Sequence, residues 1–196
     1  MLTVRRVAVW LLVSLGMAFA PGFAAEPQIE PLGIVTTDQS AQVGVQMAFD
    51  LPASVEEALH RGVPLWFSAE LAWYQERWYW MDRLVAKSQR YWRLSYQPLT
   101  RRYRLQVSPQ PIESSGLGVG LAQTYDTLGD ALSALHRIGA WTLNTGPLDA
   151  EARHRVEFRF RLEPNALLRP WLAGGGDSDW GLVLQRSQTF KVGGRP

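Results

Sequence analysis

The side chains best suited to chemistry gather between positions 66 and 96, a segment with five tryptophans, four tyrosines and three carboxylates. The carboxylates are Glu70, Glu76 and Asp82. Two carboxylates beside a bound sugar can hydrolyse a glycosidic bond, and sugar-binding clefts place such residues among tryptophans. Arginines lie close by in the sequence, however, and a carboxylate among arginines on a sheet face is more often an ion-pair partner. We therefore predict ion pairing, with glycoside hydrolysis as the alternative.

The other residue types that perform catalysis are scattered. The histidines His60, His136 and His154 are never at the spacing of a helical zinc site. No Gly-x-Ser-x-Gly motif marks a serine nucleophile, and the chain has no cysteine. We therefore predict no catalytic residue, no metal site and no cofactor, and we do not expect an enzyme.

The first 24 residues have the layout of a secretory signal peptide. Arg5 and Arg6 precede an uncharged stretch, residues 7–20, and then small and helix-breaking residues. The uncharged stretch has 14 residues, whereas a helix that crosses a membrane needs about 20. We predict cleavage after Ala24, export to the periplasm and no transmembrane span in the mature chain, with an uncleaved membrane anchor as the alternative.

Residues 25–196 are enough for one domain with a sizeable core. Without Arg5 and Arg6, 18 basic residues face 18 acidic ones, so no excess of positive charge favours nucleic acid. The lack of cysteine excludes disulfides and a lipid anchor directly after the signal peptide. We predict one exported domain that does not bind nucleic acid.

Alternation of apolar and polar residues predicts a domain rich in strands. The expected strands cover residues 28–37, 42–49, 65–74, 78–85, 90–96, 103–107, 141–143, 151–162 and 181–192. Their short connections, without alternating helices, favour an antiparallel sheet over a parallel one. The predicted fold class is all-β, an antiparallel β-sandwich of about eight strands with two short helices.

The two helices are predicted from apolar spacing and from capping residues. The helix at 55–61 opens with a Ser-x-x-Glu capping box. The helix at 127–137 has Asp126 or Thr127 as its cap and Gly139 as its stop. Apolar faces of this helix and of the strand at 151–162 point to the core, which we expect to contain Leu128, Leu132, Leu135, Phe158 and Phe160.

Charge is sorted along the aromatic segment. Residues 25–76 hold eight acidic side chains against Arg61 alone, whereas residues 77–104 hold eight basic ones against Asp82 alone. Aromatic residues and arginine are enriched at binding hot spots, and arginine binds carboxylates in a bidentate manner. The alternative is that the aromatic residues belong to the core and that the arginines pair across strands.

A strand at 78–85 would place Trp78 and Trp80 on one face and Arg77, Tyr79 and Arg83 on the other. A neighbouring strand would add to this second face. The expected binding surface, suited to an acidic or carboxylate-bearing partner, consists of Arg77, Tyr79, Arg83, Tyr91, Arg93, Arg101 and Arg102.

Four segments together resemble one known family. They are FDLPASVEEALHRGVPLWFSAEL from Phe49, RWYW from Arg77, RYWRLSYQPLTRRYRL from Arg90 and RVEFRFRL from Arg155. The chain resembles, along nearly all of residues 25–196, a family of secreted proteobacterial proteins known as domain of unknown function number 4390. This resemblance implies export but no activity and no catalytic residue. Members are often encoded near a membrane sensor kinase of the nitrogen-regulation type, which implies a role in envelope signalling.

Two functions fit these observations. The first is a periplasmic binding or accessory module whose aromatic, arginine-rich strands contact an envelope partner, such as the outer domain of a sensor kinase. The second is a carbohydrate-binding or glycan-hydrolysing domain that stacks sugars on Trp66, Trp78 or Trp80. The first predicts aromatic residues on an open face, and the second predicts a concave pocket with carboxylates.

Overall fold

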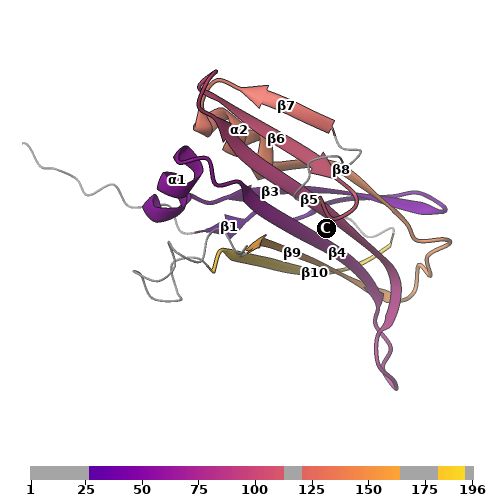
Figure 1. The fold of residues 1–196 in the computed structure, drawn as a ribbon. Coiled ribbons are helices and arrows are strands. Elements are labelled where there is room, and N and C mark those ends of the chain that lie inside the picture. Colours follow the sequence, from indigo (N-terminus) through magenta and orange to yellow (C-terminus); the bar gives the residue numbers. More distant parts are fainter. Residues whose placement is uncertain (1–26, 113–120, 164–180, 193–196) are drawn as a thin grey trace, which may run out of the picture.

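The structure of the chain, a computed structural model, describes residues 27–112, 121–163 and 181–192. Within these ranges it has ten strands and two helices, arranged as two antiparallel sheets around one apolar core (Figure 1). The predicted antiparallel β-sandwich with two short helices is confirmed. The predicted signal peptide, residues 1–24, lies outside the described residues. No helix in the described ranges is long and apolar enough to cross a membrane.

The larger sheet has six strands in the order β10-β9-β4-β5-β6-β7. These are β4 (Leu65–Gln75), β5 (Arg83–Gln97), β6 (Arg102–Ser108), β7 (Leu121–Tyr125), β9 (Arg153–Glu163) and β10 (Val183–Lys191). β4 pairs with β5 along one edge and with β9 along the other. Because β4 alternates apolar side chains with polar or aromatic ones, Leu65, Phe67 and Leu71 are buried on its inner face, whereas Glu70 lies on the outer face.

The smaller sheet is built around β3 (Ser40–Ala48). This strand pairs with β8 (Arg137–Asn144) along one edge, and with β1 (Gln28–Ile29) and β2 (Gly33–Thr36) along the other. Alternate residues of β3, including Val43 and Val45, are buried and face the larger sheet. The two sheets therefore bury one apolar face each.

Aromatic rings from several elements meet in the core. Phe160 of β9 stacks on Phe67 of β4 with 5.5 Å between ring centroids. Phe160 also lies 5.4 Å from Phe49 and 6.0 Å from Trp92. These separations fall within the range that favours aromatic pairs. The prediction that Phe158 and Phe160 are core residues is confirmed, since both are fully buried.

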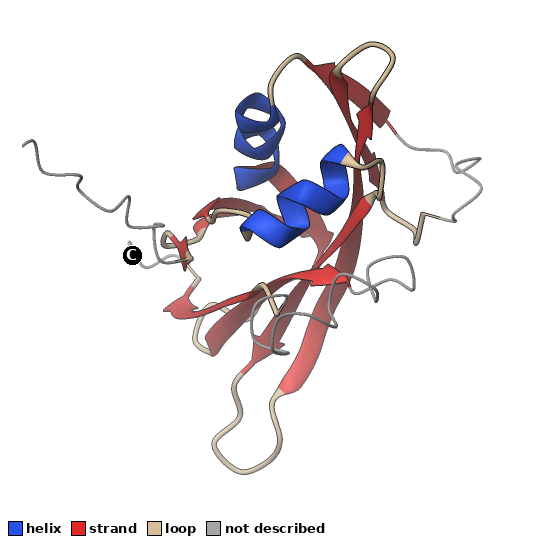
Figure 2. Cartoon of the chain, turned by 60° about the vertical axis from the view of Figure 1, so that its left-hand side comes forward, coloured by secondary structure: helices blue, strands red, loops and turns tan. Residues whose placement is uncertain are grey.

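The two helices cover the core near the end of the molecule that lies away from the β4–β5 loop (Figure 2). Helix α1 spans Ala53–His60, and helix α2 spans Leu128–His136. Leu135 of α2 is fully buried, as predicted. Leu128 and Leu132 are only half-buried, although both pack against the core.

Helix α2 begins as the sequence indicates but ends differently. The Thr127 hydroxyl accepts a hydrogen bond of 3.1 Å from the backbone N–H of Asp130, which confirms Thr127 as the cap. The prediction that Gly139 stops the helix is wrong. The chain passes directly from α2 into β8 at Arg137, so that Gly139 lies inside a strand.

The capping box predicted for α1 is also absent, because the N-cap residue is Pro52 and no side chain caps the helix. The helix therefore begins at Ala53, two residues earlier than predicted, without a hydroxyl cap.

The predicted strand at 78–85 is wrong. Residues 76–82 form the loop between β4 and β5, and β5 then runs without interruption from Arg83 to Gln97. The expected strands at 78–85 and 90–96 are therefore replaced by one long strand. Strand β7 is absent from the predicted strands, because four of its five residues are exposed and show no apolar alternation.

Candidate interaction surface

The outer face of the larger sheet carries a continuous polar network. Glu70 of β4 accepts hydrogen bonds of 2.8 Å from both Lys87 and Gln89 of β5. The Lys87 ammonium holds the pKa of the Glu70 carboxyl below its usual value. An ionised carboxylate that accepts two hydrogen bonds has no proton to donate to a leaving group near neutral pH. This geometry matches the predicted ion-pair role of Glu70.

Asp82 is also an ion-pair partner. Its carboxylate lies 2.6 Å from the guanidinium of Arg155 on β9. A small pocket of about 70 Å³ does open beside Glu70, but its lining contains no tryptophan. Pockets that hold small molecules have volumes of about 300–1,000 Å³, so this pocket is too small for a stacked sugar.

Two of the predicted binding residues, Tyr91 and Arg93, lie on this outer face and are half-buried. The Tyr91 hydroxyl donates a hydrogen bond of 2.8 Å to Gln89. The Arg93 guanidinium lies 5.0 Å from the centre of the Trp66 ring, a cation–π contact with its cross-strand neighbour. Among the described residues, the buried Nε of Arg93 has no hydrogen-bond partner. The contact of Arg93 with Trp66 is a cross-strand pairing of the kind that the alternative interpretation predicts.

The other five predicted residues lie at the two ends of β5. Arg77 and Tyr79 are in the β4–β5 loop, and Arg83 directly follows that loop. Arg101 is in the turn at the opposite end of β5, and Arg102 at the start of β6 pairs with Asp126 at 2.9 Å. The 15 residues of β5 span about 45 Å. The seven residues are therefore not one patch.

A bulge also separates the predicted residues by face. The pairing of β4 with β5 shifts between Trp73 and Tyr74, so that Arg83 pairs with Gln75 while Tyr91 pairs with Ser68. Gln75 and Ser68 are an odd number of positions apart along β4, so their side chains point to opposite faces of the sheet. Arg83 consequently does not share the outer face with Tyr91, although strict alternation along β5 predicts that it does.

Four exposed large apolar side chains are consecutive in the β4–β5 loop. Trp78 is 94% exposed, Tyr79 67%, Trp80 71% and Met81 80%. The rings of Trp78 and Tyr79 meet edge to face at 5.2 Å. Figures 1 and 2 show that this hairpin projects beyond the body of the sandwich. We call residues 77–81 the hairpin tip.

The base of the hairpin tip is fixed to β9. Arg155 bonds Asp82 on the far side of the loop, and its guanidinium lies 5.3 Å from the ring of Tyr74. The backbone N–H of Glu76 donates a hydrogen bond of 2.8 Å to the carbonyl of Arg153. Both ends of the loop are therefore tied to the same neighbouring strand, and the exposed rings stand on a rigid support.

The three histidines have structural partners. His154 is fully buried: its Nδ1 accepts a hydrogen bond from the Trp73 indole at 3.1 Å, and its Nε2 donates to the Asp149 carbonyl at 2.9 Å. His136 donates to the Phe49 carbonyl, and burial lowers the pKa of its imidazole. His60 bonds the Tyr103 hydroxyl at 2.6 Å. Within the described ranges, no three histidine or carboxylate side chains gather to hold a metal.

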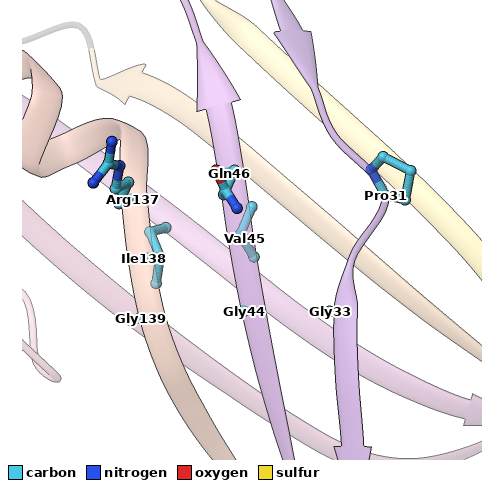
Figure 3. Close-up of a pocket in the computed structure, with 8 residues that line it drawn as sticks. All are labelled: Pro31, Gly33, Gly44, Val45, Gln46, Arg137, Ile138 and Gly139. Atoms are coloured by element: carbon cyan, nitrogen blue, oxygen red, sulfur yellow. The ribbon is translucent and has the colours of Figure 1, made fainter.

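The outer face of the smaller sheet has a hollow of about 410 Å³ (Figure 3). Gly33 and Gly44, paired across β2 and β3, and Gly139 of β8 form part of its wall. The hollow exists because these three strands lack side chains on the same stretch of the sheet. Arg137 is the one charged side chain in its lining, so the hollow carries no paired acid and base.

Comparison with known proteins identifies the family but no characterised relative. No significant match to a curated protein or to a solved structure was found. Residues 24–189 match the family described as Domain of unknown function (DUF4390). Because this match covers most of the chain, the protein belongs to the DUF4390 family.

Proposed function

We propose that the chain is an exported, periplasmic binding module that attaches to another component of the envelope through its hairpin tip and performs no catalysis. The observation that carries this proposal is the run of four exposed large apolar side chains, residues 78–81, at the end of a projecting hairpin. Exposed apolar patches that are costly to leave in water mark interaction sites in folded proteins.

Export is supported by the order of basic, uncharged and small residues in positions 1–25. The family match begins at residue 24, where the predicted signal peptide ends. The absence of cysteine in the whole chain suits an oxidising compartment, because no free thiol is left to react there.

Attachment is supported by the residue types of the tip and by the bonds that hold the base of the loop. Tryptophan, tyrosine and arginine are the types enriched at hot spots, and residues 77–80 are Arg-Trp-Tyr-Trp. The bonds of Asp82 to Arg155 and of Glu76 to the Arg153 carbonyl join the loop base to β9 before any partner binds. A preformed site loses less conformational freedom on binding than a flexible one.

The carbohydrate alternative has weaker support. Trp78 and Trp80 are exposed in the hairpin tip, and the guanidinium of Arg93 lies over the ring of Trp66. None of these rings forms the floor of a pocket with Glu70.

The proposal is tested with the protein isolated from cells and with washed envelope fragments. A tip variant carrying Trp78→Ser and Trp80→Ser should melt at the parent temperature, because both side chains are exposed, but should no longer sediment with the fragments. Leu99→Ser is the matched control, because Leu99 is a fully exposed apolar residue in the turn at the other end of β5. Equal sedimentation of parent and tip variant would contradict attachment through the tip.

Export is tested by mass spectrometry of the isolated protein, which should begin at Ala25 and be released with the periplasmic contents. A protein that begins at Met1 and stays in the cytoplasm would overturn the periplasmic assignment.

A further inference from the structure

We infer that the component bound by the hairpin tip is the headgroup region of a phospholipid bilayer, with Trp78, Trp80 and Met81 inserted to shallow depth. This inference rests on the proposed function, because it names the partner of the same tip. Four further observations on the tip support it: its area, its shape, its flanking charges and its position on the sheet.

The area of the tip is small for a protein interface. At exposures of 94%, 67%, 71% and 80%, and with about 200 Å² for each aromatic side chain and somewhat less for methionine, its three rings and Met81 together expose about 600 Å². A stable protein interface buries about 800 Å² on each partner, with a polar rim around its core. A bilayer needs no matching rim, so an isolated apolar tip is sufficient for it.

The shape and composition of the tip fit a bilayer interface. The apolar residues are consecutive in a loop that projects beyond the sandwich, a shape that can enter a fluid surface without a matching pocket. Tryptophan and tyrosine are enriched at both membrane–water interfaces, where one end of the ring system is apolar and the other is hydrated. The depth must be shallow, because the loop backbone of residues 76–82 needs water or headgroups for its hydrogen bonds.

Charged residues on either side of the tip suit lipid headgroups. Arg77 and Arg83 flank the apolar residues and are exposed. Asp82 is already neutralised by Arg155, which leaves Glu76 as the acidic neighbour. Long arginine side chains can keep their apolar stems with the inserted rings while the guanidinium reaches a phosphate. Anionic lipid should therefore strengthen the binding in a salt-sensitive manner.

The position of the tip predicts an orientation. The tip continues β4 and β5 at one end of the larger sheet, whereas Leu99 and Arg101 lie in the turn at the opposite end of β5. A chain held by the tip would stand with β5 directed away from the bilayer. Leu99 would then lie at the far end of β5, whose 15 residues span about 45 Å.

Protein-free vesicles test the inference directly. The protein isolated from cells is sedimented with vesicles of phosphatidylcholine alone, and with vesicles that also contain phosphatidylglycerol. We expect W78S/W80S to lower the vesicle partition coefficient by about tenfold or more, because each lost ring removes about 150–250 Å² of inserted surface. Leu99→Ser should bind like the parent. R77S/R83S should lose only the additional binding to phosphatidylglycerol vesicles, and added salt should have the same effect.

Each outcome decides the inference. Vesicle binding that W78S/W80S retains in full would overturn it. Tip-dependent sedimentation with envelope fragments, abolished by prior protease treatment of the fragments and absent with vesicles, would also overturn it. That result would identify a protein partner, such as the outer domain of a sensor kinase, and would leave the proposed function intact. Should W78S/W80S fail to fold, Met81→Ser with Tyr79→Ser tests the same surface.

Discussion

Replacement of Phe160 by alanine tests the packing of the sandwich most severely. Phe160 is fully buried and contacts the rings of Phe67, Phe49 and Trp92. A Phe→Ala change in a core costs about 3–5 kcal/mol in free energy of unfolding. Each favourable ring pair adds about 0.5–1.5 kcal/mol beyond the area term. With three ring pairs lost, we expect the upper part of this range, about 4–5 kcal/mol.

The measurement is urea or thermal unfolding followed by circular dichroism. For a domain of 150–250 residues each kcal/mol shifts the Tm by about 2–4 °C, so the expected decrease is about 8–20 °C. Arg159→Ala is the matched control, because Arg159 precedes Phe160 in β9 but is exposed. It should change the stability by no more than about 0.5 kcal/mol. Should Phe160→Ala fail to fold, Phe160→Leu should cost roughly 1–2 kcal/mol. Equal shifts for the core and control variants would refute the assigned facing of β9.

Two further predictions follow from α2. Burial lowers the pKa of His136 in the folded chain, so the unfolded chain binds its proton more tightly and stability decreases as the pH falls below about 6.5. His136→Gln should therefore lose less stability than the parent between about pH 8 and about pH 5.5, as measured by the urea midpoint of unfolding at each pH. The same dependence of the midpoint on pH in both proteins would contradict a role for His136. Thr127→Ala removes the hydroxyl cap and should destabilise the chain by about 1 kcal/mol, whereas Thr127→Ser should be nearly neutral. Equal midpoints for these two variants would show that the cap contributes nothing.

Strands with one buried and one solvated face could be predicted from the sequence. In β9, Val156, Phe158 and Phe160 alternate with charged residues, and the structure buries all three. This succeeds because side chains alternate between the two faces of a strand wherever one face is apolar. The same alternation predicts the strand at 65–74, which the structure shows as β4.

The hairpin tip could not be placed from the sequence. Tryptophan and tyrosine favour strands, so the run from Trp78 to Trp80 was predicted as a strand. A strand needs a partner across the ladder, however, and the tip lies beyond the ends of β4 and β5 pairing, which stops at Gln75 and Arg83. Propensity alone contains no information on where a hairpin turns.

The facing of the arginines was missed for a related reason. The bulge between Trp73 and Tyr74 shifts the register of β5, so that residues before and after it exchange faces. Arg90 points to the inner side of the sheet, where its guanidinium lies 4.6 Å from the centre of the Trp141 ring on β8. A partner from a distant segment, unknown from the local pattern, decides where such a side chain lies.

Photo-crosslinking in intact cells tests the central claim, attachment through the hairpin tip, most directly. A photoreactive residue replaces Trp80 in one variant and Leu99 in another, because both positions are exposed apolar residues at opposite ends of β5. The variant labelled at position 80 should form adducts with an envelope component, and the variant labelled at position 99 should form none. Adducts from position 99 alone, or from neither position, would contradict the claim.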